Sequence, residues 1–234
     1  MDTNDRWETE DWLQSVKRIL HWSSTVDSSK PMMFILRHSH RETLRDHEHM
    51  GSAGLTEMGR RLSVEVGRRI PPGRSMELYT SFVPRAYETA EGIREGYSER
   101  GKEVAEVELL PTLVSPQILN PEVWLQLHPD GQNITDYVNR WVRGEFEGYI
   151  EPYEEYKPKF MDDMVGRLVA SENDIVHICT THDFTLMSAK RMFLGRDLDY
   201  DDREPFLGGL GLTVDGSEVE VFIGSANRAI SIRR

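Results

Sequence analysis

Two short, mostly apolar segments of this sequence each stop abruptly at a cluster of polar residues. The first covers residues 32–36 and runs into Arg37-His38-Ser39-His40-Arg41, and the second covers residues 174–180 and runs into Thr181-His182-Asp183. Apolar runs of this length are typical of buried strands. Because ligands usually bind at the carboxyl ends of strands in open α/β sheets, the pattern predicts a polar site at one edge of such a sheet.

The rest of the chain alternates between helical and extended patterns. The further predicted elements are, in chain order, a helix over 55–70 with Thr56 as its N-cap, a strand over 76–80, a helix over 84–94, and strands over 210–214 and 218–223 joined at Asp215-Gly216. This alternation predicts an α/β fold, a three-layer α/β/α sandwich with a mostly parallel sheet and an antiparallel edge. We expect one domain over residues 1–234.

Two segments fall outside this alternation. Residues 5–22 have the spacing of an amphipathic helix, with Trp12, Val16 and Ile19 among its apolar positions, and we expect it to pack on the domain or, alternatively, to dock a partner. Residues 113–156 interleave aromatic and acidic side chains. We interpret this stretch as a mainly helical insertion that forms either a cap over the site or a solvated helix pair with a core-facing aromatic stripe.

Charge and composition restrict the partners of the chain. Its formal net charge of −12 argues against a broad nucleic-acid surface, so phosphate chemistry needs a local basic pocket. No apolar run approaches the roughly 20 residues of a membrane span, and the start lacks the pattern of a secretory signal. Because Cys179 is the single cysteine, no intrachain disulfide can form, and we expect a cytoplasmic protein without membrane or nucleic-acid partners. The sequence does not predict an oligomeric state.

Four segments resemble, in the same order, motifs of the histidine phosphatase superfamily. Residues 34–41 resemble its opening Arg-His-Gly motif, residues 55–61 its LTxxGxxQ helix start, residues 79–90 its SSPxxRAxxTA segment, and residues 181–183 the His-Asp pair of its acid-phosphatase branch. The resemblance implies a phosphoglycerate mutase-like fold and the hydrolysis of small phosphomonoesters through a phosphohistidine. The spacing of Arg37 and Arg41 looks closer to the acid-phosphatase branch than to the mutase-like branch.

Residues at these motif positions have the chemistry to bind a phosphoryl group. The guanidiniums of Arg37 and Arg85 can bind its equatorial oxygens bidentately, and the resemblance adds Arg41 to them. His182, if protonated, donates to the same oxygens. We therefore predict a phosphate-binding site for a small phosphorylated substrate that consists of Arg37, Arg41, Arg85 and His182.

The covalent chemistry is assigned to two further residues. His38 is the predicted nucleophile and forms a phosphohistidine that water later cleaves, which divides one difficult step into two. Asp183 is the predicted proton donor to the leaving group, and Glu108 and Glu42 are the next residues to consider for that role. The predicted catalytic set, which uses no cofactor and no metal ion, is His38, Asp183, Arg37, Arg85 and His182.

Two other functions stay open at this stage. A metal-dependent hydrolase is suggested by His38-Ser39-His40 and His47-Glu48-His49, whose spacing resembles that of metal ligands. A non-catalytic phospholigand-binding or scaffold protein is suggested by Ser39, which stands where the family has glycine, and by the acidic residues of the insertion. We expect four further histidines to be surface, core or supporting residues, namely His40, His47, His49 and His177.

Overall fold

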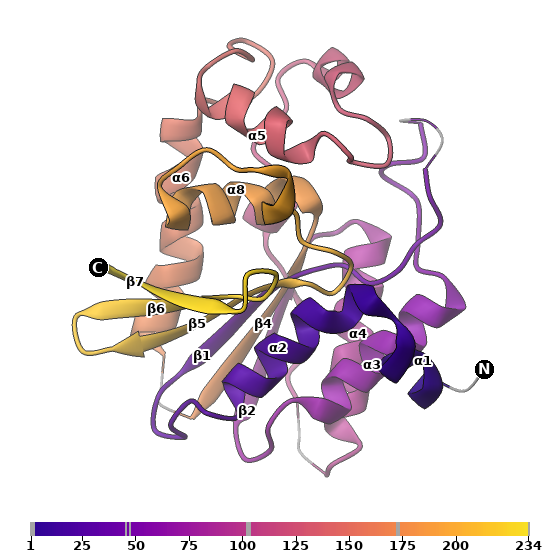
Figure 1. Ribbon diagram of the computed structural model, residues 1–234, viewed down its shortest axis with the longest axis vertical. Helices are drawn as coiled ribbons and strands as arrows, with labels where there is room; N and C mark the ends of the chain where they lie inside the picture. Colours follow the sequence, from indigo (N-terminus) through magenta and orange to yellow (C-terminus); the bar gives the residue numbers. More distant parts are fainter. Residues whose placement is uncertain (1–2, 45, 47, 102–103, 172–173, 234) are drawn as a thin grey trace.

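A computed structural model describes residues 3–44, 46, 48–101, 104–171 and 174–233 of the chain. These residues form a seven-stranded sheet in the order β3-β2-β4-β1-β5-β6-β7 (Figure 1). The parallel strands are β1 (Met32–Arg37), β2 (Ser75–Thr80), β3 (Glu108–Leu109) and β4 (Ile175–Thr181). The antiparallel strands are β5 (Gly209–Asp215), β6 (Glu218–Ile223) and β7 (Arg228–Arg233). The predicted mostly parallel sheet with an antiparallel edge is therefore confirmed.

Helices cover both faces of this sheet (Figure 1). One face carries α2 (Gln14–Ser23), α3 (Glu57–Arg69) and α4 (Pro84–Ser98), and the other carries α5 (Ile134–Val142), α6 (Tyr153–Met161), α7 (Arg167–Ala170) and α8 (Asp183–Leu194). Successive residues of β1 point to opposite faces, so Met33 and Ile35 pack in the α8 layer, whereas Met32 and Phe34 pack in the α3 layer. The predicted three-layer α/β/α sandwich is confirmed.

Local signals set the ends of several elements as predicted. Thr56 caps α3 by accepting a hydrogen bond from the Gly59 amide at 3.0 Å, and α4 begins at Pro84. Gly216, at φ +56°, lies in the turn between β5 and β6. The sheet contains two strands beyond the five predicted, β3 and β7. β3 has only two residues, and in β7 only Ile230 and Ile232 indicate a buried face. In the described part of the chain, no helix has the length and apolar character needed to cross a membrane.

The predicted single helix over residues 5–22 is wrong. The structure has two helices, α1 (Thr3–Thr9) and α2, with a 3₁₀ turn at Asp11–Leu13 between them. The break occurs at Glu10, whose backbone is extended at φ −79° and ψ 113° and whose carboxylate accepts a hydrogen bond from Nε1 of Trp12 at 3.0 Å. Ile19 is fully buried as expected. Trp12, however, lies at the margin of the hydrophobic core formed by the sheet and helices α2, α3 and α4, and it lines a surface cleft.

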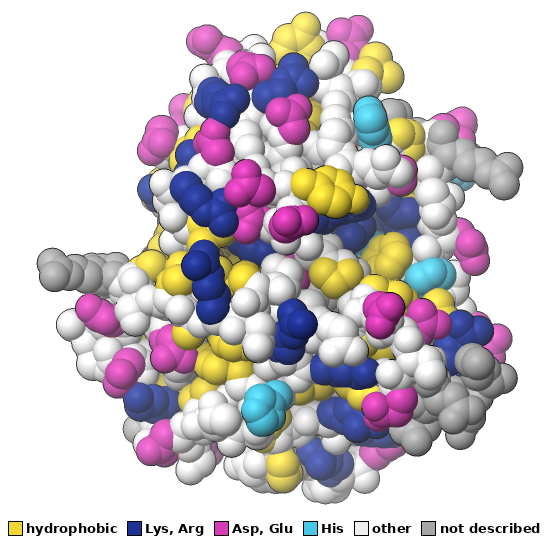
Figure 2. Space-filling view, in the orientation of Figure 1, with side chains coloured by type: hydrophobic (Ala, Val, Ile, Leu, Met, Phe, Trp, Pro, Cys, Tyr) yellow, Lys and Arg dark blue, Asp and Glu magenta, His cyan; other side chains and the backbone are white. Residues whose placement is uncertain are grey.

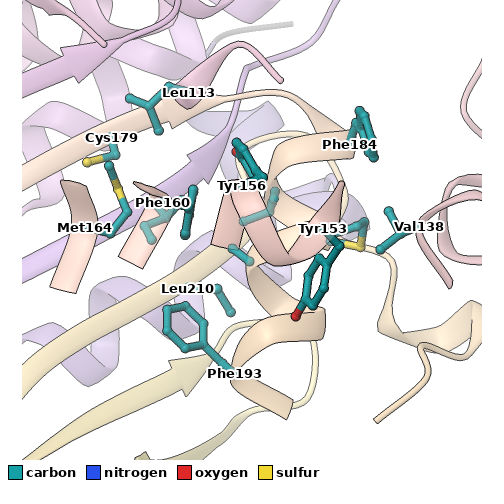
Figure 3. Packing of buried hydrophobic residues seen from close by; sticks show 14 of the residues in the cluster. Leu113, Val138, Tyr153, Tyr156, Phe160, Met164, Cys179, Phe184, Phe193 and Leu210 are labelled. Carbon is teal, nitrogen blue, oxygen red and sulfur yellow. The ribbon is translucent and has the colours of Figure 1, made fainter. Parts of the chain in front are cut away.

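The insertion over residues 113–156 is less helical than predicted. It contains α5, a 3₁₀ turn at Pro121–Gln126 and the first residues of α6, and much of the remainder is irregular. Most of its aromatic side chains, among them Tyr153 and Tyr156, are buried in the core layer of α8 (Figure 3), whereas Tyr149 is half-exposed. The buried side chains form a core-facing stripe, whereas Asp130 and Gln132 of the same insertion reach the surface cleft.

A buried ion pair and its hydrogen bonds connect four parts of the fold that are distant in sequence. Nζ of Lys190 in α8 lies 2.9 Å from Oε1 of Glu204 in the loop before β5, and both side chains are almost completely buried. Glu204 also accepts hydrogen bonds from Ser15 Oγ at 2.6 Å and from the Ser225 amide at 3.2 Å. Lys190 donates further to the Asp202 carbonyl and to Ser225 Oγ. Both buried charges are thus compensated by partners.

Lys190→Met should destabilise the fold by about 3–5 kcal/mol, because it leaves the Glu204 carboxylate buried without its cation. Urea unfolding followed by circular dichroism measures this loss. The exposed ion pair of Lys30 with Asp215 provides the control, and Lys30→Met should change the free energy of unfolding far less. Equally small effects of both substitutions would show that Lys190 is not a buried, paired cation.

Candidate active site

The polar residues that follow β1 and β4 meet at one end of the sheet. The two strands are parallel neighbours with Arg37 opposite Thr181, and the His38 amide donates to the Thr181 carbonyl at 2.8 Å. The first residue of α8 is Asp183, and the first turn of α4 supplies Arg85. The structure brings together all the predicted site residues in one electrostatic cluster, namely Arg37, His38, Arg41, Arg85, His182 and Asp183. Their roles remain predictions.

His38 has the protonation state that a nucleophile needs. Its Nδ1 lies 2.8 Å from the Ser39 carbonyl oxygen, which can only accept, so Nδ1 carries the hydrogen. Burial, and then the charges of Arg85 and Arg37, lower the pKa of His38 well below its ordinary value. The ring is therefore neutral at neutral pH, and Nε2 keeps a free electron pair.

His182 faces the same site as a neutral donor. Its Nε2 lies 2.6 Å from Ser81 Oγ, which accepts a hydrogen bond from the Val83 amide. Because the Ser81 hydroxyl has no other acceptor among the described residues, it donates its hydrogen to Nε2. Burial, and then the charge of Arg85, lower the pKa of His182 well below its ordinary value. The remaining hydrogen is on Nδ1, which is buried and has no partner among the described residues. His182 can thus donate to an oxyanion without being protonated.

The free energy of unfolding should fall as the pH drops below about 6.5, the ordinary pKa of histidine. The pKa values of His38 and His182 are lowered in the folded protein, so in this window the unfolded chain binds protons that the folded chain does not. Each ring contributes up to about 1.4 kcal/mol per pH unit. Urea unfolding between neutral pH and about pH 5 measures the slope. Constant or rising stability toward acid pH would contradict two neutral, buried rings.

Three arginines surround these histidines. Arg37 Nη1 donates to the Glu204 carbonyl at 3.1 Å, and Arg41 and Arg85 also donate to backbone carbonyls. The Nε atoms of all three are buried and find no acceptor in the described part of the chain. Burial is the main cause that lowers the pKa of Arg37 and Arg85 to about 10, and both stay charged at neutral pH. The cluster is a concentrated positive charge that lacks a matching anion.

Asp183 partly offsets this charge. Its Oδ2 lies 3.1 Å from Arg37 Nη2, in a partly buried ion pair. Burial alone raises the pKa of Asp183, but Arg37 and Arg41 outweigh burial and lower the pKa below its ordinary value. Asp183 is therefore ionised when no ligand is bound. The two alternative proton donors, Glu42 and Glu108, are exposed, and Glu108 lies on the edge strand β3.

Ser39, which replaces a glycine of the family motif, fits into the site without blocking it. The side chain is buried, and its Oγ donates to the Gly59 carbonyl of α3 at 2.8 Å. Its backbone amide donates to Thr89 Oγ1 at 2.9 Å. Because both polar groups are satisfied by the fold, the hydroxyl makes no demand on a ligand.

The histidines predicted to have no catalytic role lie apart from one another in the fold, where they are described. Nδ1 of His40 lies 2.8 Å from Thr56 Oγ1, His177 is buried in β4, and His49 is exposed. His47 lies outside the described residues. Within the described ranges, no three His, Cys, Asp or Glu side chains are grouped as metal ligands.

An open cleft of about 780 Å³ leads to the arginines. Figure 2 shows arginine or lysine side chains recessed between hydrophobic and acidic side chains on this face. Besides Arg37 and Arg41, the cleft is lined chiefly by Trp12, His40, Asp130, Gln132, Tyr200, Asp201, Arg203 and Phe206. No sequence motif indicates Phe206 or Arg203, and Ser81 lies in a recognised segment without a predicted role.

The chain was compared with known proteins. No family model and no curated protein sequence matches it. Among solved structures, YhfR from Bacillus stearothermophilus matches with a TM-score of 0.58 at 19% identity, over 82% of this chain and 96% of that one. A phosphoglycerate mutase from Bacillus anthracis matches with a TM-score of 0.51 at 16% identity, over 89% and 93% of the two chains. The chain has the phosphoglycerate mutase-like fold.

The phosphoglycerate mutase-like fold confirms what the sequence motifs imply about architecture. A phosphoserine phosphatase from Entamoeba histolytica, in complex with 3-phosphoglyceric acid, also matches, with a TM-score of 0.51 at 15% identity over 86% of this chain and 94% of that one. Mutases and phosphatases thus share this fold, and the fold alone distinguishes neither the reaction nor the branch. The reaction has to be argued from the site itself.

Proposed function

We propose that this chain hydrolyses small phosphomonoesters through a phosphohistidine on His38. The proposal rests on four buried donors that lack a partner among the described residues, namely Nε of Arg37, Arg41 and Arg85 and Nδ1 of His182. Buried donors without acceptors are costly, and a phosphoryl group supplies several acceptor oxygens at once. The neutral His38 lies beside this set, with its ring centroid 5.6 Å from that of His182.

Two chemical steps follow from this arrangement. In the first, Nε2 of His38 attacks phosphorus, the bond from phosphorus to the ester oxygen breaks, and Asp183 donates a proton to the departing alcohol. In the second, water attacks the phosphohistidine, Asp183 takes up a proton from that water, and phosphate leaves as His38 regains its electron pair. The arginines and His182 hold the phosphoryl oxygens in both steps.

Asp183 must gain a proton before the first step, although the arginines lower its pKa in the ligand-free protein. A phosphoryl dianion reverses this effect, because its charge offsets that of the arginines and its oxygens compete with Asp183 for Arg37. Substrate binding is then coupled to proton uptake by Asp183. Until the substrate arrives, the ion pair with Asp183 compensates the charge of Arg37.

The use of Asp183 as the acid follows the pattern of the acid-phosphatase branch. The position of Arg41 within the arginine cluster supports this assignment, and so does the exposure of Glu108 on β3. The similar phosphoserine phosphatase is in complex with 3-phosphoglyceric acid, which supports a small phosphorylated substrate for this chain.

Phosphate release from a panel of phosphomonoesters tests the proposal. We expect the phosphatase activity to persist in EDTA, because side chains of the protein bind the phosphoryl oxygens. We expect vanadate to inhibit this activity, because it mimics five-coordinate phosphorus on His38. Activity that EDTA removes and a divalent metal ion restores would favour the metal-dependent hydrolase. Tight phosphate binding without turnover of any ester would favour the non-catalytic phospholigand-binding protein.

A further inference from the structure

Aromatic side chains line the cleft, and among them Phe206 contacts several residues of the site. Its ring centroid lies 5.6 Å from that of His38 and 5.3 Å from that of His40. The guanidinium carbon of Arg37 lies 4.6 Å from the same centroid. Trp12 meets Phe206 edge to face at 5.9 Å. Arg37 therefore covers one face of the Phe206 ring, and the partly exposed remainder of the ring lines the cleft close to His38.

The alcohol part of a substrate must lie between this aromatic surface and Asp183. Gly131 is in contact with Asp183, because a Cβ atom on Gly131 would lie 2.5 Å from Asp183 Oδ2. The neighbours of Gly131, Asp130 and Gln132, line the same cleft as Phe206. Since the alcohol oxygen has to take the proton of Asp183, the rest of the alcohol extends into this cleft.

The charges of the outer cleft disfavour a second anionic group on the substrate. Apart from the buried arginines and Glu204, which is paired with Lys190, the charged side chains that line the cleft are Asp130, Asp201 and Arg203. Nη2 of Arg203 donates to the Asp130 carbonyl at 2.8 Å. Two carboxylates against one guanidinium repel a further carboxylate or phosphate.

We infer that the outer cleft selects phosphomonoesters whose alcohol carries an uncharged aromatic ring. The inference rests on the proposed function and narrows its substrate class. The ring packs against Phe206 and Trp12 and gains aromatic contact and apolar burial. A small acid such as phosphoglycerate offers no flat apolar face and is repelled by Asp130 and Asp201.

Both aromatic side chains are held in place before a ligand binds. Nε1 of Trp12 donates to Glu10, which orients the indole. Phe206 precedes Leu207, whose φ of +57° is left-handed and whose amide donates to the His38 carbonyl at 3.3 Å. Leu207 is fully buried, so core packing maintains this unfavourable backbone conformation. A preformed surface binds a ring with little ordering cost.

A comparison of benzyl phosphate with butyl phosphate tests the inference, because both alcohols are poor leaving groups and they differ in the ring. We expect kcat/KM for benzyl phosphate to exceed that for butyl phosphate by about tenfold, and that for 3-phosphoglycerate by more. Cyclohexylmethyl phosphate, which has a ring without aromatic faces, should fall between benzyl and butyl phosphate. The inference is overturned if benzyl phosphate is no better than butyl or cyclohexylmethyl phosphate, or if 3-phosphoglycerate is preferred.

Substitution of Trp12 tests whether this side chain causes the preference for benzyl phosphate over butyl phosphate. Trp12→Leu should reduce the benzyl-to-butyl ratio of kcat/KM by about fivefold, because it removes one aromatic wall. Tyr149→Leu removes a half-exposed aromatic ring that does not line the cleft, and it should leave the ratio unchanged. A folded Trp12→Leu protein with the unaltered ratio would overturn the inference.

Binding measurements separate this inference from the proposed function. Benzylphosphonate and butylphosphonate resist hydrolysis at their phosphorus–carbon bond. Calorimetry with the unaltered protein therefore measures the affinity of the cleft for each compound in the absence of turnover. We expect benzylphosphonate to bind about tenfold more tightly. This preference without any phosphatase activity would overturn only the proposed reaction. Phosphatase activity with equal affinities for the two phosphonates would overturn only the inference.

Discussion

His38→Ala should abolish phosphate release, with a loss of at least about a thousandfold in kcat. The substitution removes Nε2, the atom that receives the phosphoryl group in the proposed mechanism. Rapid quench with radiolabelled substrate should trap a phosphoprotein that is labile in acid and stable in base. The same experiment on His38→Ala should trap none.

A second histidine provides the matched control for this experiment. His49 is exposed and pairs with Asp46, and His49→Ala should label normally. His38→Ala keeps the arginines and His182, so it should still bind phosphate, which separates loss of chemistry from loss of binding. Undiminished label in His38→Ala would assign the phosphoryl group to another residue.

Asp183→Asn should slow the hydrolysis of glycerol phosphate by about 10²–10⁴-fold and that of p-nitrophenyl phosphate far less. An alkoxide is a strong base and needs a proton as it leaves, whereas p-nitrophenolate is stable as an anion. Single-turnover kinetics of phosphohistidine formation on folded variants measure the difference.

His182→Ala is the matched comparison for Asp183→Asn. Its Nδ1 is proposed to act on the phosphoryl oxygens, so the loss should be similar for both esters. Equal losses in Asp183→Asn would mean that Asp183 only positions the site. Glu42, which follows Arg41, would then be the first alternative donor to test, and Glu108 the second.

The strand-end residues of the site could be predicted from sequence alone. The apolar runs that became β1 and β4 are far apart in the chain, but parallel pairing places their carboxyl ends side by side. That rule placed His38 and Asp183 at one edge of the sheet, and the resemblance to the histidine phosphatase superfamily singled them out among the strand-end residues. It could not show that Asp183 pairs with Arg37 or that Ser81 directs the hydrogen of His182 to Nδ1, because these features depend on side-chain geometry.

Loop conformations were the least predictable part of the structure. No proline or glycine interrupts residues 5–22, so the sequence contains no signal for the break at Glu10. Phe206 lies in a segment without regular periodicity, and its place depends on the left-handed Leu207. The composition of residues 113–156 likewise could not show whether the aromatic side chains face the core or a ligand.

The proposed phosphate-binding cluster depends on contacts between distant parts of the chain, so we expect it to assemble late in folding. Ser15 reaches Glu204 across 189 residues of chain, and the Glu204 carbonyl holds Arg37 across 167. Contacts between such distant residues form only after long stretches of chain have closed on themselves, at a cost in chain entropy. We therefore expect a nascent or partly unfolded chain to lack the assembled cluster, and the proposed phosphate binding should report completion of the fold across nearly its whole length.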